Sequence, residues 1–110
     1  LVEGLDPKKT SFVLDTGWVQ QGGGDVRHWI ETLKGRIDIL HLKDVGRRDG
    51  DKPLFFTEIG NGNLWWEGII ESAVNSGVKH FCVEQDGEWI YNDPFKSLEV
   101  SANYLRKFIG

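Results

Sequence analysis

Three residues of the kinds that bind metal ions or transfer protons each follow a short apolar run of the sequence. These residues are Asp15, His41 and Glu84. The runs that precede them are residues 12–14, 37–40 and 80–83. A carboxylate, an imidazole and a second carboxylate form a ligand set suited to divalent cations such as Mn²⁺, Co²⁺, Mg²⁺ and Zn²⁺. The three residues therefore predict a metal site, provided that the fold brings them together.

Each of these residues also has a simpler interpretation when it is taken singly. An aspartate after a strand is often a helix cap, and a glutamate there is often the exposed partner of an ion pair. His41 lies between Leu40 and Leu42, where an imidazole without a polar partner would cost stability. Repetition at three successive run ends favours the metal site over three separate coincidences.

The three runs are rich in residues suited to buried parallel strands. The segments between and after them have helical periodicity, and the first of these helices is preceded by Asp25, a typical cap. The predicted helices cover residues 26–33, the segment between 66 and 77, and residues 94–109. The polar segment 46–53 predicts a long loop.

This alternation of strands and helices predicts an α/β fold with right-handed crossovers and helices on one side of the sheet. In a parallel barrel the carboxyl ends of the strands converge on one rim, so side chains far apart in sequence can point at a common centre. The chain has 110 residues, half or less of the roughly 250 that a complete (β/α)₈ barrel needs. We therefore expect one domain or a piece of one.

The composition is 39% hydrophobic and 27% charged, with a net charge of -4. No apolar run approaches the roughly 18 residues of a membrane span, and residues 1–10 carry no secretory signal, which together predict a cytoplasmic protein without a membrane partner. The acidic balance disfavours nucleic acid as a partner. The single cysteine, Cys82, excludes an intramolecular disulfide, and its strand-like surroundings predict a buried side chain.

Longer segments around these residues carry a family likeness. They read LDTGW (residues 14–18), LKGRI (33–37), HLKD (41–44), EIGNG (58–62) and VEQD (83–86). In this order they resemble the sugar phosphate isomerase/epimerase superfamily, which includes xylose isomerase-like barrels, ketose 3-epimerases and inosose dehydratase-like enzymes. The likeness runs through nearly the whole chain. It implies a partial (β/α)₈ TIM barrel with three parallel strands alternating with helices.

The resemblance implies that residues 1–110 form a single C-terminal portion of such a barrel, from the end of the fifth helix through strands six, seven and eight. Enzymes of this kind hold a divalent ion by Glu, Asp, His and Glu from four consecutive strands. Asp15, His41 and Glu84 match the last three of these ligands. The first glutamate, from strand five, has no counterpart, since Glu3 stands in the wrong context.

The same resemblance implies a metal-dependent sugar or sugar phosphate isomerase or epimerase, which transfers a proton at the carbon beside a carbonyl. Glu84 would be both a ligand and one of two acid/base carboxylates. The other would be the missing glutamate of strand five, so the isolated chain would be incomplete as an enzyme. The alternatives are an inosose dehydratase-like lyase and an inert sugar-binding or assembly fragment.

The expected small-molecule partner is a sugar, a polyol or one of their phosphates. The candidates for contact with it are Trp18, Gln20, Lys43, Arg47 and Arg48. Relatives often have a substrate-binding histidine where this chain has Trp18, which either stacks on a sugar ring or packs in the rim. Relatives also often use a basic residue after the ligand histidine to bind a hydroxyl or phosphate. Asp44 either approaches a second metal ion or anchors its loop.

Three parallel strands with helices on one side leave the other face and two strand edges uncovered. Water would then meet surface that a complete barrel buries. We therefore expect a homo-oligomer in which copies of the chain complete the open sheet. The alternative is that the chain is a truncated remnant of a longer product.

Overall fold

The computed structural model describes residues 11–51 and 53–109, so the expectations about Glu3 and about a secretory signal fall outside the described part. In chain order the elements are β1 (Phe12–Asp15), α1 (Thr16–Gln21), α2 (Val26–Thr32), β2 (Ile37–Leu42), β3 (Asp44–Arg47), β4 (Leu54–Thr57), α3 (Trp66–Asn75), β5 (His80–Val83), a 3₁₀ turn (Ile90–Asn92) and α4 (Pro94–Leu105). None of the described helices is both long and apolar enough to cross a membrane.

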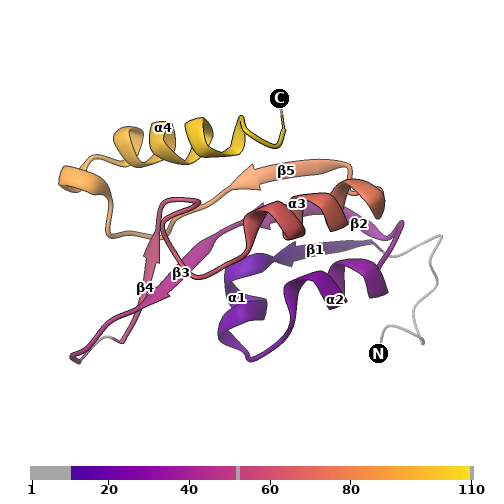
Figure 1. Ribbon diagram of the computed structural model, residues 1–110, viewed down its shortest axis with the longest axis horizontal. Helices are drawn as coiled ribbons and strands as arrows, with labels where there is room; N and C mark the ends of the chain where they lie inside the picture. Colours follow the sequence, from indigo (N-terminus) through magenta and orange to yellow (C-terminus); the bar gives the residue numbers. More distant parts are fainter. Residues whose placement is uncertain (1–10, 52, 110) are drawn as a thin grey trace.

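Three of the strands form a parallel sheet in the order β1-β2-β5. Helices α2 and α3 pack against each other and cover one face of that sheet (Figure 1). The strands coincide with the three apolar runs of the sequence, and the helices follow the predicted periodicity. The predicted fold class, parallel strands alternating with helices as in part of a TIM barrel, is therefore confirmed.

Helices α2 and α4 both begin at an aspartate cap, and the sequence predicts the one at Asp25. The Asp25 carboxylate accepts hydrogen bonds from the backbone N–H groups of Arg27 and His28 at the start of α2. Asp93 caps α4 in the same way, and Pro94 lies in its first turn. These caps fix where each helix begins, and so where the preceding strand or loop must end.

Side chains alternate between a covered face and an open face of the sheet. Leu40 and Leu42 of β2 lie in the core together with Ile30 of α2. Val13 of β1 points to the opposite face and is 58% exposed. Cys82 of β5 is also exposed, so the prediction of a buried cysteine is wrong. Its place in the alternation of β5 puts it on the face that the described helices leave uncovered.

The polar segment predicted as a long loop, residues 46–53, contains the end of β3 and the connection from β3 to β4, and these two strands form an antiparallel hairpin that the sequence did not predict. Val45 lies opposite Phe56 and Gly46 opposite Phe55 in this pairing. β3 begins two residues after β2 ends, and the hairpin projects beyond the carboxyl end of the parallel sheet (Figure 1). Helix α1 is a second short element that periodicity did not predict. Both additions lie at the same end of the sheet as the three predicted ligands.

Asp44 ties the hairpin to the segment that leads into α3. Its side chain is 0% exposed. It accepts hydrogen bonds at 2.7 to 3.3 Å from the backbone N–H groups of Val45, Gly60, Gly62 and Leu64 and from Trp66 Nε1. A Cβ on Gly62 would overlap this carboxylate, so the close approach requires glycine. Of the two roles that the sequence left open for Asp44, these contacts support the anchor.

We expect Asp44→Ala to lower the free energy of unfolding by about 3 kcal/mol, because it leaves several buried donors without an acceptor. Asp38→Ala is the matched control, since Asp38 forms a surface ion pair with Lys79 at 3.2 Å, and such pairs contribute about 1 kcal/mol or less. Urea unfolding followed by circular dichroism measures both variants. Equal losses in the two variants would contradict the anchoring role of Asp44.

Candidate metal centre

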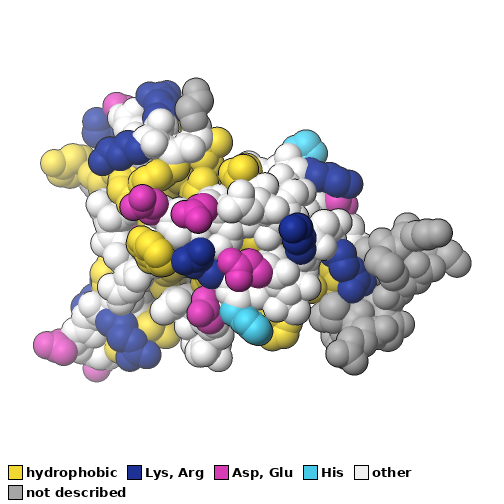
Figure 2. All heavy atoms as spheres, turned by 45° about the vertical axis from the view of Figure 1, so that its right-hand side comes forward, with side chains coloured by type: hydrophobic (Ala, Val, Ile, Leu, Met, Phe, Trp, Pro, Cys, Tyr) yellow, Lys and Arg dark blue, Asp and Glu magenta, His cyan; other side chains and the backbone are white. Residues whose placement is uncertain are grey.

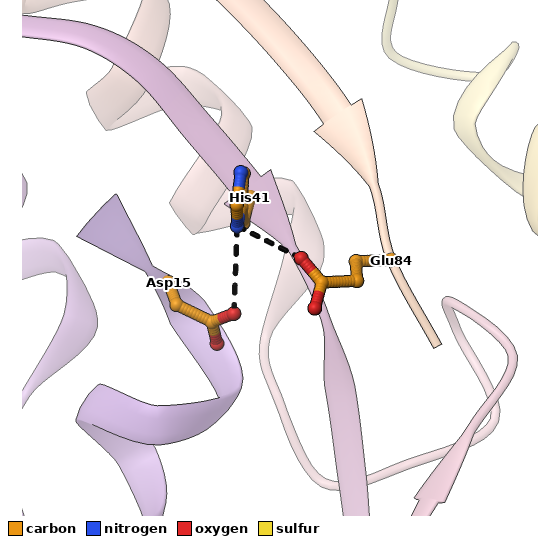
Figure 3. Close-up of side chains that lie close together, drawn as sticks. All are labelled: Asp15, His41 and Glu84. Carbon is orange, nitrogen blue, oxygen red and sulfur yellow. Dashed lines mark ion pairs between the residues drawn. The ribbon is translucent and has the colours of Figure 1, made fainter. Parts of the chain in front are cut away.

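Asp15, His41 and Glu84 converge at the carboxyl end of the parallel sheet (Figure 3). Each offers one ligand atom, and these atoms all lie within 4.8 Å of one another. His41 Nδ1 lies 2.9 Å from Glu84 Oε2 and 3.8 Å from Asp15 Oδ2. The proximity on which the predicted metal site depends is therefore present in the structure.

The register of the strands produces this convergence. Asp15 lies opposite His41 across β1 and β2, and His41 lies opposite Cys82 across β2 and β5. Glu84 is two residues beyond Cys82 and so shares its face of the extended chain. The Glu84 N–H continues the ladder by donating to the Leu42 carbonyl at 3.0 Å. All three side chains thus lie on the open face of the sheet.

Asp15 combines a capping role with its place in the cluster. Its Oδ1 accepts a hydrogen bond of 2.9 Å from the backbone N–H of Trp18, which caps α1. Its Oδ2 is the oxygen that faces His41. The cap therefore fixes the carboxylate in one orientation and leaves the second oxygen for a cation.

One imidazole nitrogen and two carboxylates are a donor set that fits a divalent cation. The side chains of the cluster are 16% to 36% exposed. This partial exposure leaves room for further ligands, such as water or a substrate oxygen. No second group of this kind occurs among the described residues. Within the described part of the chain, Asp15, His41 and Glu84 are thus the residues that could hold a metal ion.

Lys43 adds a buried cation to the cluster. Its side chain is 1% exposed, and its Nζ lies 3.1 Å from Asp15 Oδ2, 3.2 Å from Glu84 Oε1 and 2.8 Å from Asp86 Oδ2. Burial alone would lower the pKa of this ammonium group, but its hydrogen bonds to Asp86, Asp15 and Glu84 outweigh burial and raise its pKa above the ordinary value of 10.5. The substrate contact predicted for Lys43 would require it to leave one of these carboxylates.

The backbone and stem of Lys43 are held in place by its neighbours. Thr16 Oγ1 donates to the Lys43 carbonyl at 2.8 Å and accepts from the Lys43 N–H at 2.9 Å. A Cβ on Gly17 would lie 2.9 to 3.1 Å from the Lys43 side-chain carbons, so glycine makes room for the stem. The ammonium lies 5.4 Å from the ring centre of Trp18 and 5.2 Å from that of Phe56.

Asp86 lies beside the cluster of Asp15, His41 and Glu84, and the sequence did not predict a role for it. The Lys43 ammonium donates to its carboxylate and holds the pKa of Asp86 below the ordinary value of 3.8. The available signal was its spacing from Glu84, since residues two apart in an extended segment share one face. Acidic side chains gather around basic and histidine side chains on this part of the surface (Figure 2).

A second buried carboxylate, Glu58, fixes the segment that carries Glu84 and Asp86. Glu58 is 4% exposed. Its Oε2 accepts hydrogen bonds from Gln85 Nε2 at 2.9 Å and from Ser97 Oγ at 2.8 Å. It thereby joins the end of β4 to the segment after β5 and to α4. Burial raises the pKa of Glu58, but these hydrogen bonds outweigh burial and leave its pKa below the ordinary value of 4.5.

The lowered pKa of Glu58 predicts a contribution to acid sensitivity. A carboxyl whose folded-state pKa is depressed stabilises the fold above its unfolded value of 4.5, and this contribution is lost as the pH falls through the folded-state value. We expect Glu58→Gln to lower stability at pH 7 by about 2 kcal/mol, and the difference from the wild type to shrink below pH 4.5.

Denaturant unfolding at a series of pH values measures this difference. Glu99→Gln is the control, because Glu99 is exposed on the surface of α4 and pairs with Lys96 at 3.7 Å. A Glu58→Gln variant whose stability runs parallel to that of the wild type at all pH values would show that the charge of Glu58 contributes nothing.

The remaining candidates for substrate contact lie in different places. Trp18 is 51% exposed, and its ring meets Phe56 edge-on with centroids 5.6 Å apart, beside the Lys43 ammonium. Gln20 and Arg47 help to line a cavity of about 150 Å³ between α1 and the hairpin, whose described lining does not include the three predicted ligands. Arg48 pairs with Glu88 at 2.6 Å. Trp18 and Lys43 are thus the candidates that the structure brings to the cluster.

Comparisons with known proteins agree with this fold. No family model matches the sequence. An inosose dehydratase from Geobacillus thermodenitrificans (strain NG80-2) is 29% identical over an alignment of 124 residues, which covers 100% of this chain and 42% of that protein. An inosose dehydratase from Mesomycoplasma hyopneumoniae (strain 7448) is 26% identical with the same two coverages. The chain thus spans less than half the length of the curated relatives that it matches.

Solved structures show the same partial match. A sugar phosphate isomerase/epimerase from Parabacteroides distasonis ATCC 8503 superposes with a TM-score of 0.77 and 29% identity, over 97% of this chain and 34% of that one. An L-ribulose 3-epimerase shares the fold, with a TM-score of 0.53 and 20% identity over 91% of this chain and 28% of that one. The chain therefore resembles proteins of the sugar phosphate isomerase/epimerase superfamily, and its fold corresponds to part of a xylose isomerase-like TIM barrel.

Proposed function

We propose that this chain supplies three metal ligands and one acid/base group to a metal-dependent isomerase or epimerase of sugars, polyol-derived ketones or their phosphates. The observation that carries the proposal is the convergence of Asp15, His41 and Glu84 within 4.8 Å. A divalent ion such as Mn²⁺, Co²⁺, Mg²⁺ or Zn²⁺ would polarise a substrate carbonyl at this position. Because the chain spans 42% of its curated relatives, the activity would belong to a complete barrel.

Glu84 is the proposed proton carrier. Its Oε2 faces His41 and its Oε1 faces Lys43, while its side chain remains 36% exposed and thus open to a substrate. The carboxylate would accept the proton from the carbon beside the carbonyl and return it to a neighbouring atom, which completes an isomerisation. Epimerisation would need a second carboxylate on the opposite side of the substrate, a role that the family resemblance gives to a glutamate of strand five.

Inosose dehydratase activity is the second candidate, and the names of the curated relatives favour it. It would share the first step, in which Glu84 takes the proton next to the carbonyl. The C–O bond of the adjacent carbon would then break, and the leaving hydroxide would take up a proton and depart as water. Deuterium uptake from D₂O without loss of water would indicate isomerase chemistry, whereas an unsaturated ketone would indicate the dehydratase. An inert sugar-binding fragment would give neither product.

Metal binding tests the proposal on the chain itself. We expect calorimetric titration with Mn²⁺ or Co²⁺ to give one site, and His41→Ala to weaken binding at least about 100-fold, because it removes the sole nitrogen ligand. His80→Ala is the matched control, since His80 is an exposed histidine of the neighbouring strand β5. A titration without binding, or equal effects of the two substitutions, would count against the metal site.

The open sheet supports the proposal of a homo-oligomer. β1 and β5 are the two edges of the parallel sheet, and the face that carries Val13 and Cys82 is exposed. Free strand edges and uncovered apolar positions favour pairing with another chain. We expect sedimentation velocity to give a species larger than the monomer of 12.5 kDa. A single monomeric species across a range of concentrations would contradict this.

A further inference from the structure

The Lys43 ammonium and a bound metal ion would both interact with the carboxylates of Asp15 and Glu84. A lysine ammonium has three N–H donors, and here it faces three carboxylates, those of Asp15, Glu84 and Asp86, at 2.8 to 3.2 Å. Two of these belong to the cluster with His41. Asp15 Oδ2 in particular is shared, since it lies 3.1 Å from Lys43 Nζ and 3.8 Å from His41 Nδ1.

The position of Lys43 is fixed by its burial and by the contacts of its backbone and side chain. Its side chain is 1% exposed, its backbone is bonded twice to Thr16 Oγ1, and its stem passes where Gly17 has no Cβ. Trp18 and Phe56 place their rings about the ammonium. A charge held in this way cannot move far, so its effect on a nearby cation is a fixed property of the fold.

Asp86 gives the ammonium an acceptor that lies outside the three predicted metal ligands. At 2.8 Å its contact is the shortest of the three ion pairs of Lys43. Without a metal ion, Lys43 neutralises part of the negative charge of three crowded carboxylates. With a divalent ion on Asp15 and Glu84, Asp86 would be the one of the three carboxylates that the ammonium does not share with the ion.

We propose that Lys43 is the resident cation of this carboxylate cluster and competes with a divalent metal ion for Asp15 and Glu84, while Asp86 weakens that competition by holding the ammonium. The inference rests on the proposed metal site and assigns Lys43 a role in setting its affinity. Lys43 stabilises the metal-free cluster and keeps metal binding reversible. Asp86 acts through Lys43.

A double-mutant cycle tests this with Mn²⁺ as the probe. We expect Lys43→Met to bind Mn²⁺ about tenfold more tightly in calorimetric titrations, because a neighbouring positive charge is removed. Asp86→Asn should bind Mn²⁺ several-fold more weakly, because the Lys43 ammonium then interacts more strongly with Asp15 and Glu84. In the Lys43→Met background Asp86→Asn should have almost no effect. Lys79→Met, at a lysine that is 66% exposed, should leave the affinity unchanged.

Thermal unfolding provides a second readout. Metal-free Lys43→Met should melt at least about 5 °C below the wild type, and saturating Mn²⁺ should recover more of that loss than it adds to the wild type. A purely structural role would lower both melting temperatures equally and would overturn the inference. If Lys43→Met does not fold, the Mn²⁺ affinity of Asp86→Asn is the test. An affinity equal to or higher than that of the wild type would contradict the competition.

The outcomes separate this inference from the proposed function. If the wild type binds Mn²⁺ and Lys43→Met binds it equally or more weakly, the proposed competition is wrong, but the proposed metal site is still supported. If Lys43→Met binds Mn²⁺ and the wild type does not, the competition is supported, and the proposal that the native chain binds a metal ion is contradicted. Absence of binding in both overturns the two proposals together.

Discussion

The parallel register of β1, β2 and β5 is the constraint on which the rest of this molecule depends. It sets Asp15 opposite His41 and His41 opposite Cys82, with Glu84 two residues further on. Because side chains alternate along a strand, this register decides at once which residues enter the core and which point to the open face. A slip of one residue in β2 would bury His41 and expose Leu40 or Leu42. The apolar pattern that drives folding therefore also places the polar cluster.

Buried carboxylates hold the segments beyond the strand ends. Asp44 receives five hydrogen bonds from the hairpin and from the approach to α3, and Glu58 joins the end of β4 to Gln85 and Ser97. A buried acid without such donors would be strongly destabilising. When its hydrogen bonds are formed, each of these carboxylates makes one arrangement of the segments around it much more favourable than the alternatives. The segment that carries Glu84 and Asp86 gains its fixed position in this way.

The sequence predicted much of the framework but not its polar interior. The three strands, the cap at Asp25 and the proximity of Asp15 to His41 follow from local pattern and from the geometry of parallel strands. The β3–β4 hairpin could not be predicted in this way, because its two short strands are joined by a polar turn and their sequences show little alternation of apolar and polar residues. The burial of Lys43 was not predicted, since it depends on carboxylates that come from distant segments. Cys82 was misjudged because its flanking apolar residues do not reveal which face of the sheet its side chain points to.

The charge balance of the cluster connects the fold to the chemistry proposed for it. Isomerisation and dehydration would begin with the same proton transfer to Glu84, so the residues around Glu84 matter equally to both. A carboxylate that accepts a proton from carbon must be ionised yet not overstabilised by its neighbours. Lys43 lies 3.2 Å from one Glu84 oxygen and His41 2.9 Å from the other. Lys43 and His41 therefore hold the two oxygens of Glu84 in place, whereas the choice between the two reactions falls to groups that contact the rest of the substrate.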